Sequence, residues 1–157
     1  MRLYRSLFLA LVTLALAGCG GGMVRRVSEP TASIQQLSVR ADGSWSLELR
    51  LQNYSSIPMR FERVALDVQL GAESAGRLEQ TVGISIGPES ADIVQISLQP
   101  SSFARLAIAD VLAGHRSLPY VLKGKVWATP EEKKQREFDI DARNTLSPAP
   151  GLDGVLR

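Results

Sequence analysis

Trp45-Ser46-Leu47-Glu48-Leu49-Arg50-Leu51-Gln52 alternates apolar and polar side chains along its whole length. Successive side chains of a β-strand point to opposite faces, so a period of two places all the apolar residues of this segment on one face. The opposite face carries the Ser, Glu, Arg and Gln side chains. Residues 45–52 are therefore predicted to form a strand with one face in a core and the other in water, as in antiparallel sheets.

The same alternation recurs along most of the chain. Residues 64–70 repeat it beyond a loop at 53–58, where Pro58 has no backbone N–H to donate to a sheet. A glycine-containing hairpin turn at 71–76 and a Gly-Pro turn at 87–90 separate shorter segments of the same kind. About seven strands are expected, near residues 36–40, 45–52, 64–70, 77–86, 93–98, 120–126 and 138–142.

One segment has helical spacing instead. Residues 103–113 repeat apolar side chains every three to four positions, at Ala104, Ala107, Ile108, Val111 and Leu112. Ser101 or Ser102 can serve as the N-cap, and Gly114 follows the last apolar residue. Many short strands, Gly/Pro turns and one short helix predict an all-β protein, folded as an antiparallel β-sandwich.

The first 18 residues have the layout of an export signal. Arg2 and Arg5 precede an uncharged apolar run at residues 7–17. As a helix this run rises only about 16 Å, well short of the roughly 30 Å hydrocarbon layer of a bilayer. A cleaved signal peptide at residues 1–18 is therefore a better interpretation than a permanent transmembrane span.

The end of this signal holds the only cysteine of the chain. Leu16-Ala17-Gly18-Cys19 resembles the bacterial lipobox, in which cleavage falls between the residues corresponding to Gly18 and Cys19 and the cysteine sulfur receives a diacylglyceryl group. The resemblance implies a lipid-modified Cys19 as the first mature residue, and two or three acyl chains would hold the protein stably on a membrane. The alternative is an ordinary signal with an incidental cysteine. Gly20 stands where an inner-membrane retention signal would place Asp, which implies the outer membrane.

Composition excludes several classes of function. Without Arg2 and Arg5, the count of Lys and Arg falls from 18 to 16, which equals the 16 Asp and Glu residues. The mature chain therefore has no basic excess for nucleic acid. Because Cys19 is the only cysteine, no internal disulfide and no thiolate metal site can form. Apart from the covalent lipid on Cys19, we expect no cofactor and no metal.

These features divide the chain into four parts. Residues 1–18 are the signal peptide, and residues 19–33 lack an apolar period and are expected to form a flexible tether. Residues 34–143 hold the sandwich. Residues 144–157 contain Pro148, Pro150, Gly151 and Gly154, and we expect a disordered tail there.

The sequence offers little material for catalysis. His115 is the only histidine and has no reactive cysteine to partner it. Glu131 and Glu132 lie in a charged hairpin loop, whereas Asp139 and Asp141 lie on the polar face of a strand. Solvent exposure explains both carboxylate pairs better than acid–base catalysis or cation binding does. We therefore expect no catalytic residues and no enzymatic activity.

The two tryptophans are expected to have different roles. Trp45 shares the phase of the apolar residues in its strand, so we expect it in the core, together with the few aromatic residues Phe61, Phe103 and Phe138. Trp127 is out of phase with the apolar residues of the 120–126 segment. Trp127 is therefore the candidate for a surface contact with a partner.

The order of these segments resembles the LEA type 2, or WHy, domain over residues 35–142. The likeness is carried by the strand at 47–53, Ile57-Pro58, the strand at 64–70, Ala75-Gly76, the Gly87-Pro88 turn and the segment Pro119-Tyr120-Val121-Leu122-Lys123-Gly124-Lys125-Val126. Many members have Asn-Pro-Asn after the first long strand, where this chain has Asn53-Tyr54-Ser55. The resemblance implies a fibronectin-III/immunoglobulin-like sandwich, a link with desiccation and other water stress and, for some members, binding of lipid.

Together these interpretations predict a non-enzymatic lipoprotein of the outer membrane whose domain faces the periplasm and supports tolerance of drying or osmotic stress. Its partners would be the membrane, through the lipid, and other envelope proteins or lipids. The alternatives are a lipid-binding or lipid-carrying module and an assembly or adaptor subunit of an envelope complex. A domain of this size normally packs its interior closely, so we expect no ligand cavity between the sheets.

Overall fold

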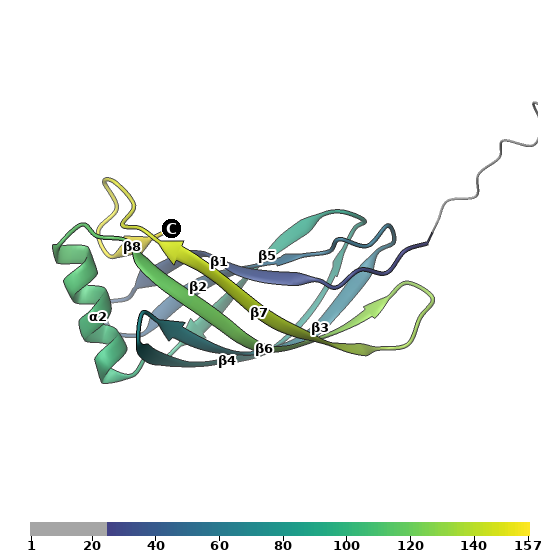
Figure 1. Ribbon diagram of the computed structural model, residues 1–157, viewed down its shortest axis with the longest axis horizontal. Helices are drawn as coiled ribbons and strands as arrows, with labels where there is room; N and C mark the ends of the chain where they lie inside the picture. The colour runs from purple at the N-terminus through teal and green to yellow at the C-terminus, as the bar shows by residue number, and fades with distance from the viewer. Residues whose placement is uncertain (1–24) are drawn as a thin grey trace, which may run out of the picture.

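Two antiparallel four-stranded sheets pack face to face in the computed structural model, which describes residues 25–157 (Figure 1). One sheet has the strand order β5-β2-β1-β8 and the other has the order β4-β3-β6-β7. The elements are β1 (Thr31–Val39), β2 (Trp45–Gln52), β3 (Met59–Leu70), β4 (Glu73–Ile86), β5 (Ala91–Leu98), α2 (Ser102–Ala113), β6 (Leu118–Pro130), β7 (Arg136–Leu146) and β8 (Val155–Leu156). The predicted all-β sandwich with one short helix is confirmed for the described residues.

Strand β2 shows why the chain folds in this way. Trp45 is 1 % exposed and Leu47, Leu49 and Leu51 are fully buried, whereas the polar residues between them face outward. Leu66, Leu122 and Val126 of the opposite sheet are also fully buried. Each sheet therefore contributes one apolar face to the core, and burial of these side chains, worth roughly 1.5–3 kcal/mol each, holds the two layers together.

Strand β6 approaches β3 unusually closely at Gly124. This glycine lies opposite Leu66 of β3 and has a φ of +151°, which side chains rarely tolerate. A Cβ atom at this position would lie 2.2 Å from the backbone oxygen of Ala65. The sheet can form with this geometry only because residue 124 has no side chain.

Strand β1 begins earlier than the alternation predicted, at Thr31 rather than Gln36, and contains a β-bulge between Ile34 and Gln36. A bulge leaves backbone groups without a ladder partner. The buried hydroxyl of Tyr120 accepts a hydrogen bond from the Ile34 N–H at 2.9 Å, so a side chain of the opposite sheet satisfies this group. Burial raises the pKa of the Tyr120 hydroxyl above its ordinary value of 10.0.

Helix α2 lies at one end of the sandwich and begins where the sequence predicted. The Ser101 hydroxyl accepts a hydrogen bond from Ala104 N–H at 3.2 Å and donates one to the carbonyl of Ser74 at 2.7 Å. The helix ends with bonds from His115 N–H to Leu112 O and from Arg116 N–H to Val111 O, the Schellman pattern. His115, rather than Gly114, has the left-handed φ of +47°, because Gly114 is still in a right-handed conformation.

The structure corrects the expectation of a disordered tail at residues 144–157. Strand β7 runs on to Leu146, and β8 then pairs with β1 through Leu156 and Val155. Ser147 and Arg157 exchange two backbone hydrogen bonds of 2.7 and 2.8 Å. Left-handed glycines at 151 and 154 turn the chain back onto the sheet, so the Pro/Gly composition marks turns here rather than disorder.

The expected tether at 19–33 is also shorter than predicted. Its last residues belong to β1, and the Arg26 N–H donates to the hydroxyl of Ser56 at 2.8 Å. Ser28 N–H donates to the hydroxyl of Ser55 at 3.0 Å. Polar side chains of a loop therefore hold residues that have no apolar pattern of their own. The predicted signal peptide, the predicted cleavage site between Gly18 and Cys19 and the predicted lipidation of Cys19 fall outside the described residues.

Candidate functional surfaces

The surface contact predicted at Trp127 lies on the outer face of the β4-β3-β6-β7 sheet. Trp127 is half-buried, and the guanidinium of Arg63 stacks over its ring, 3.8 Å from the centroid. Its indole Nε1 donates a hydrogen bond of 3.0 Å to Oε1 of Glu137. Lys125 Nζ donates to Oε2 of the same carboxylate at 2.6 Å. The ring and the N–H of Trp127, the two groups with which it could bind a partner, therefore already contact neighbouring side chains of this protein.

Electrostatics of this cluster follow from the same contacts. Hydrogen bonds from Lys125 and then Trp127 lower the pKa of the Glu137 carboxyl, and the bond to Glu137 raises the pKa of the Lys125 ammonium. Both groups therefore keep their charges over a wide range of pH. This is a stable surface cluster rather than an acid–base pair matched to neutral pH.

Opposite charges face each other over the rest of this sheet face. Asp67 pairs with Arg77 at 3.0 Å, Arg63 with Glu79 at 3.4 Å, and Asp141 with Lys123 and Arg143 at 3.7 and 3.5 Å. Their side chains are about half exposed, so each pair contributes at most about 1 kcal/mol. Among residues 25–157 no group of three or more His, Cys, Asp or Glu residues is placed to hold a metal ion.

The helix end of the molecule has a different character. We use this name for α2, the β1–β2 turn (residues 40–44) and the β7–β8 loop (residues 147–154). Phe103 and Leu106, one turn apart on α2, are each 68 % exposed. The expectation that Phe103 lies in the core is wrong, because the helix buries the face formed by Ala104, Ile108 and Val111. Phe103 and Leu106 lie outside that stripe.

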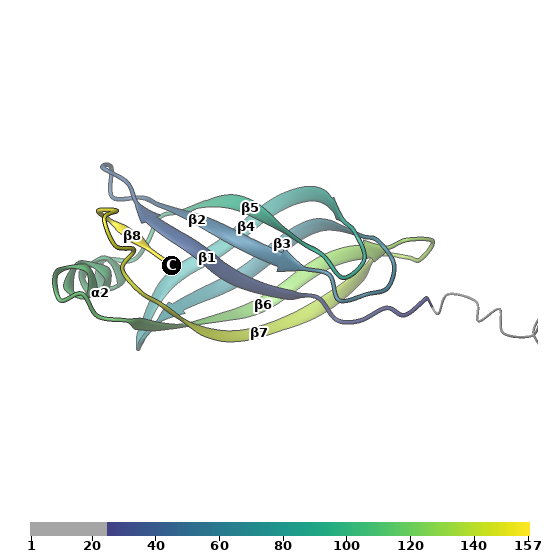
Figure 2. The same ribbon diagram turned by 90° about the horizontal axis from the view of Figure 1, so that it is seen from above.

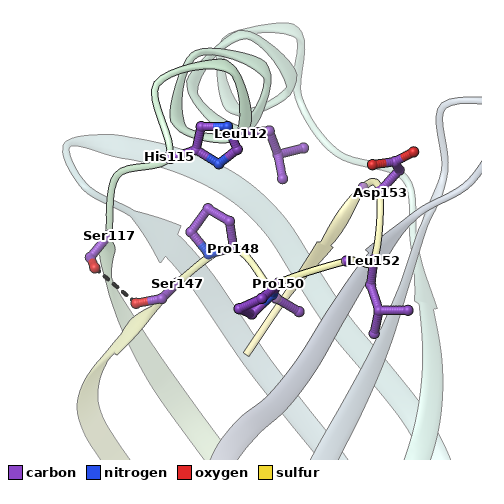
Figure 3. Close-up of a pocket in the computed structure, with 11 residues that line it drawn as sticks. Leu112, His115, Ser117, Ser147, Pro148, Pro150, Leu152 and Asp153 are labelled. Carbon is purple, nitrogen blue, oxygen red and sulfur yellow. Dashed lines mark hydrogen bonds between the residues drawn. The ribbon is translucent and has the colours of Figure 1, made fainter.

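A cleft with a volume of about 510 Å³ lies at the helix end, between the end of α2 and the β7–β8 loop (Figure 3). His115, Leu112, Pro148, Pro150 and Asp153 are among the residues that line it. Ser117 and Ser147 also line the cleft, but their hydroxyls bond to each other at 2.8 Å. The imidazole of His115 hydrogen-bonds to no other residue in the described part of the chain, so no nucleophile–base pair is assembled.

The tether end lies opposite the helix end (Figure 2). It consists of residues 25–30, the β2–β3 loop (residues 53–58), the β4–β5 loop (residues 87–90) and the β6–β7 loop (residues 131–135). The fully buried side chain of Asn53 joins the β2–β3 loop to the β4–β5 loop. Its Nδ2 donates to the carbonyls of Ile57, Ile86 and Gly87 at 2.9, 3.2 and 2.9 Å, and its Oδ1 accepts from Ser55 N–H at 2.9 Å. The asparagine of the Asn53-Tyr54-Ser55 segment thus has a structural role.

Sequence reasoning found some of these residues and missed others. It placed Trp45 in the core and Trp127 on the surface, as observed. It missed Asn53 and the exposure of Phe103 and Leu106. The exposure of Phe103 and Leu106 was detectable from the sequence, because both residues lie outside the apolar stripe of the helix. Within residues 25–157 the structure contains no helix that is both long and apolar enough to span a membrane.

Comparison with known proteins identifies the family. The fold is an all-β sandwich of two antiparallel sheets, and a fold by itself does not fix a function. The sequence pattern of the LEA_2 family, described as "Late embryogenesis abundant protein", matches residues 48–144. This match covers more than half of the chain, and the chain therefore belongs to the LEA_2 family. The family supports a stress-associated protein of non-enzymatic type.

Solved structures are similar to the chain in fold. The solution structure of AT1g01470 from Arabidopsis thaliana is similar with a TM-score of 0.51 and 11 % identity, covering 83 % of this chain and 84 % of that one. A crystal structure of a protein from Archaeoglobus fulgidus gives a TM-score of 0.42 and 13 % identity, covering 76 % and 97 % of the two chains. Curated proteins gave no significant match in sequence.

Proposed function

We propose that this protein is a LEA_2 lipoprotein of the bacterial outer membrane that supports tolerance of drying or osmotic stress through contacts with other envelope components. The observation that carries the proposal is the LEA_2 match over residues 48–144, next to an N-terminal segment that ends in Leu16-Ala17-Gly18-Cys19. The domain supplies the link with stress, and the lipobox-like segment supplies the location. The sandwich itself would face the periplasm.

The anchor is tested first. Mass spectrometry of the mature N-terminus should find an acylated Cys19, and membrane fractions should retain the protein after a salt wash. A Cys19→Ala variant should lose this retention. A soluble mature protein with an unmodified thiol would refute the anchor, whatever the domain does.

The stress role is tested separately in cells. A deletion strain should survive drying and osmotic shock less well than its parent, and a copy of the gene with intact Cys19 should restore survival. The Cys19→Ala copy should restore less, because its product is no longer held at the membrane. Equal survival of parent and deletion strain under both stresses would count against the proposal.

One observation favours a second candidate, an adaptor subunit of an envelope complex. Phe103 and Leu106 are the most exposed large apolar side chains among the described residues, and they are adjacent on one helix. Aromatic and aliphatic side chains of this kind commonly anchor protein–protein contacts. Crosslinking in whole cells from a photoreactive residue at the exposed position 109 of α2 should capture a specific protein if this candidate is correct. The Phe103→Ser and Leu106→Ser changes should abolish the capture.

Lipid carriage remains the third possibility, and we still expect no ligand between the sheets. Leu47, Leu49, Leu66 and Leu122 expose none of their surface. Native mass spectrometry of the protein purified from cells should therefore show only the covalent lipid. A second lipid bound in stoichiometric amount would make lipid carriage the leading function.

A further inference from the structure

The geometry points to a membrane-contact surface at the tether end: we propose that Lys133, Lys134 and Tyr54 rest on anionic lipid headgroups and orient the sandwich with its helix end away from the bilayer. The inference rests on the proposed lipid anchor at Cys19. It concerns a surface of the folded domain, which the anchor by itself does not specify.

The first step is the place where the chain leaves the domain. Arg25 Nη2 pairs with Glu131 at 2.8 Å and its Nη1 pairs with Glu132 at 2.9 Å. The Arg26 N–H and the Ser56 hydroxyl bond at 2.8 Å, and Ser56 N–H donates back to the Arg26 carbonyl at 3.0 Å. Residues 25 and 26 therefore lie between the β6–β7 loop and the β2–β3 loop and contact both.

The second step is the reach of the remaining chain. Only the residues from Cys19 to Val24 separate the proposed anchor from Arg25. A chain of that length spans at most about 20 Å, whatever its conformation. If residues 19–33 were all free, as the sequence suggested, the span would be about 50 Å. The two loops beside Arg25 are thus held near the membrane, whereas the helix end lies at the far end of the sandwich (Figures 1 and 2).

The third step is the charge that these loops present. Arg25 pairs with both Glu131 and Glu132, and Arg26 lies 3.7 Å from Glu89. Lys133 and Lys134 follow in the same loop, are exposed, and form no ion pair with any other described residue. Arg25 balances one of the two negative charges of Glu131 and Glu132. Together with Lys133 and Lys134 this group therefore carries a net charge of +1, and the lysines are left available for an outside anion.

The fourth step is the exposed aromatic ring of the neighbouring loop. Tyr54 is 47 % exposed, and its carbonyl accepts a bond from Arg26 Nη2 at 3.5 Å, so it too lies beside the exit of the chain. A tyrosine combines an apolar ring with a polar hydroxyl and suits the boundary between headgroups and acyl chains. Lysines beside such a ring are the usual partners of an anionic lipid surface.

Attraction of this kind acts only at short range. At physiological ionic strength the screening length is about 8 Å, so the lysines gain nothing unless the tether keeps them close. Within that distance the one net positive charge of this group favours the contact state by roughly 5-fold. The short tether and the two lysines are therefore needed together, and the outcome is a preferred orientation rather than stronger retention.

Hydrogen exchange on vesicles tests the surface. The processed chain, residues 19–157, is coupled through the Cys19 thiol to a maleimide lipid, in vesicles of phosphatidylcholine alone or with added phosphatidylglycerol. On the anionic vesicles, amide exchange in residues 53–57 and 131–136 should slow several-fold relative to the zwitterionic ones. Exchange in residues 147–154 should stay the same.

Two double variants with the same change in charge make the test specific. Lys133→Glu with Lys134→Glu should abolish the slowing. Arg40→Glu with Arg105→Glu, which changes exposed cations of the helix end, should leave it intact. Equal exchange of the wild-type loops on both vesicles would overturn the inference, as would slowing confined to the helix end.

Failure of the anchor gives a different result. The coupling to maleimide lipid does not depend on acylation in the cell, so the vesicle experiment reports only on the surface. An unmodified Cys19 in the native protein would overturn the lipid anchor and, with it, the orientation proposed for the cell. An acylated Cys19 with no difference between vesicles would overturn the contact surface alone.

Discussion

The tether end and the helix end of this sandwich are built by different forces. At the tether end, the buried Asn53 side chain and the hydroxyls of Ser55 and Ser56 join three segments by hydrogen bonds: residues 25–30, the β2–β3 loop and the β4–β5 loop. At the helix end, α2 is seated by Ala104, Ile108 and Val111 and leaves Phe103 and Leu106 exposed. A polar network fixes the direction in which the chain leaves the domain, whereas apolar packing tolerates a surface that remains open to a partner.

This contrast matches the two roles that we propose for the domain, a position on the membrane and contact with a partner. Hydrogen-bond geometry is directional, so the tether end can hold Arg25 and Arg26 in one place between two loops. Apolar contact is not directional, so the helix end has no comparable control over what it binds. The first end suits a defined position on a membrane, and the second suits contact with varied partners.

The largest expected effect comes from the strand that connects both ends. Gly124→Ala would place a Cβ atom 2.2 Å from the Ala65 carbonyl oxygen at a φ of +151°. We expect the free energy of unfolding to fall by about 3 kcal/mol or more, measured by urea denaturation. Gly87→Ala is the control, since its nearest neighbour would lie at an ordinary 3.7 Å. Comparable stability of the two variants would contradict the close approach of β6 to β3.

Asn53→Ala should destabilise the tether end and leave the helix end unchanged. The change leaves the carbonyls of Ile57, Ile86 and Gly87 and the Ser55 N–H without their partner, and we expect a loss of about 3 kcal/mol. Hydrogen exchange should accelerate in residues 25–30 and 53–58 and remain unchanged in α2. Gln69→Ala removes an amide side chain from an exposed position of β3, and it should cost little. Faster exchange of α2 in Asn53→Ala would show that the two ends are not independent.

Tyr120→Phe tests the contact of β6 with the bulge in β1. Removing the hydroxyl leaves the buried Ile34 N–H without an acceptor, at a cost of about 2 kcal/mol at neutral pH. Burial raises the pKa of Tyr120. The stability that the protonated hydroxyl gives to the fold is therefore complete below pH 10 and declines as the pH rises through the folded-state pKa. The stability difference between wild type and variant should therefore narrow above pH 10. Tyr54→Phe, at an exposed position, should cost little at neutral pH.

The smallest effect should be a gain at the helix end. His115 has a left-handed φ of +47° at the position where helices usually end in glycine. His115→Gly should raise the free energy of unfolding by about 0.5 kcal/mol, because relief of the strained conformation exceeds the added entropy of the unfolded chain. Ala113→Gly, inside the helix, should instead lower it by about 1 kcal/mol. A loss of stability in His115→Gly would show that the histidine side chain makes a contact that stabilises the fold.

Sequence alone located most of the elements, because their pattern is local. Alternation marked β2 and β3, and the spacing of apolar residues with Ser101 before them marked α2 to within one residue. Order of the motifs also indicated the family that the LEA_2 match shows. Errors fell at residues 25–33 and 144–157, where composition suggested a free chain and the structure shows polar contacts and a short edge strand. Another error was Phe103, which was expected in the core and is exposed.

What the sequence determined by itself was the set of faces that must be buried, since periodicity depends only on neighbours along the chain. What only the tertiary structure decided was how polar groups far apart in sequence meet: the Tyr120 hydroxyl with the Ile34 N–H, Arg25 with Glu131, and the Asn53 amide with the Gly87 carbonyl. Hydrogen bonds and close approaches of this kind depend on register and distance between strands, which no local pattern encodes. The open face of α2 and the loops beside Arg25 are for the same reason visible only in the folded chain.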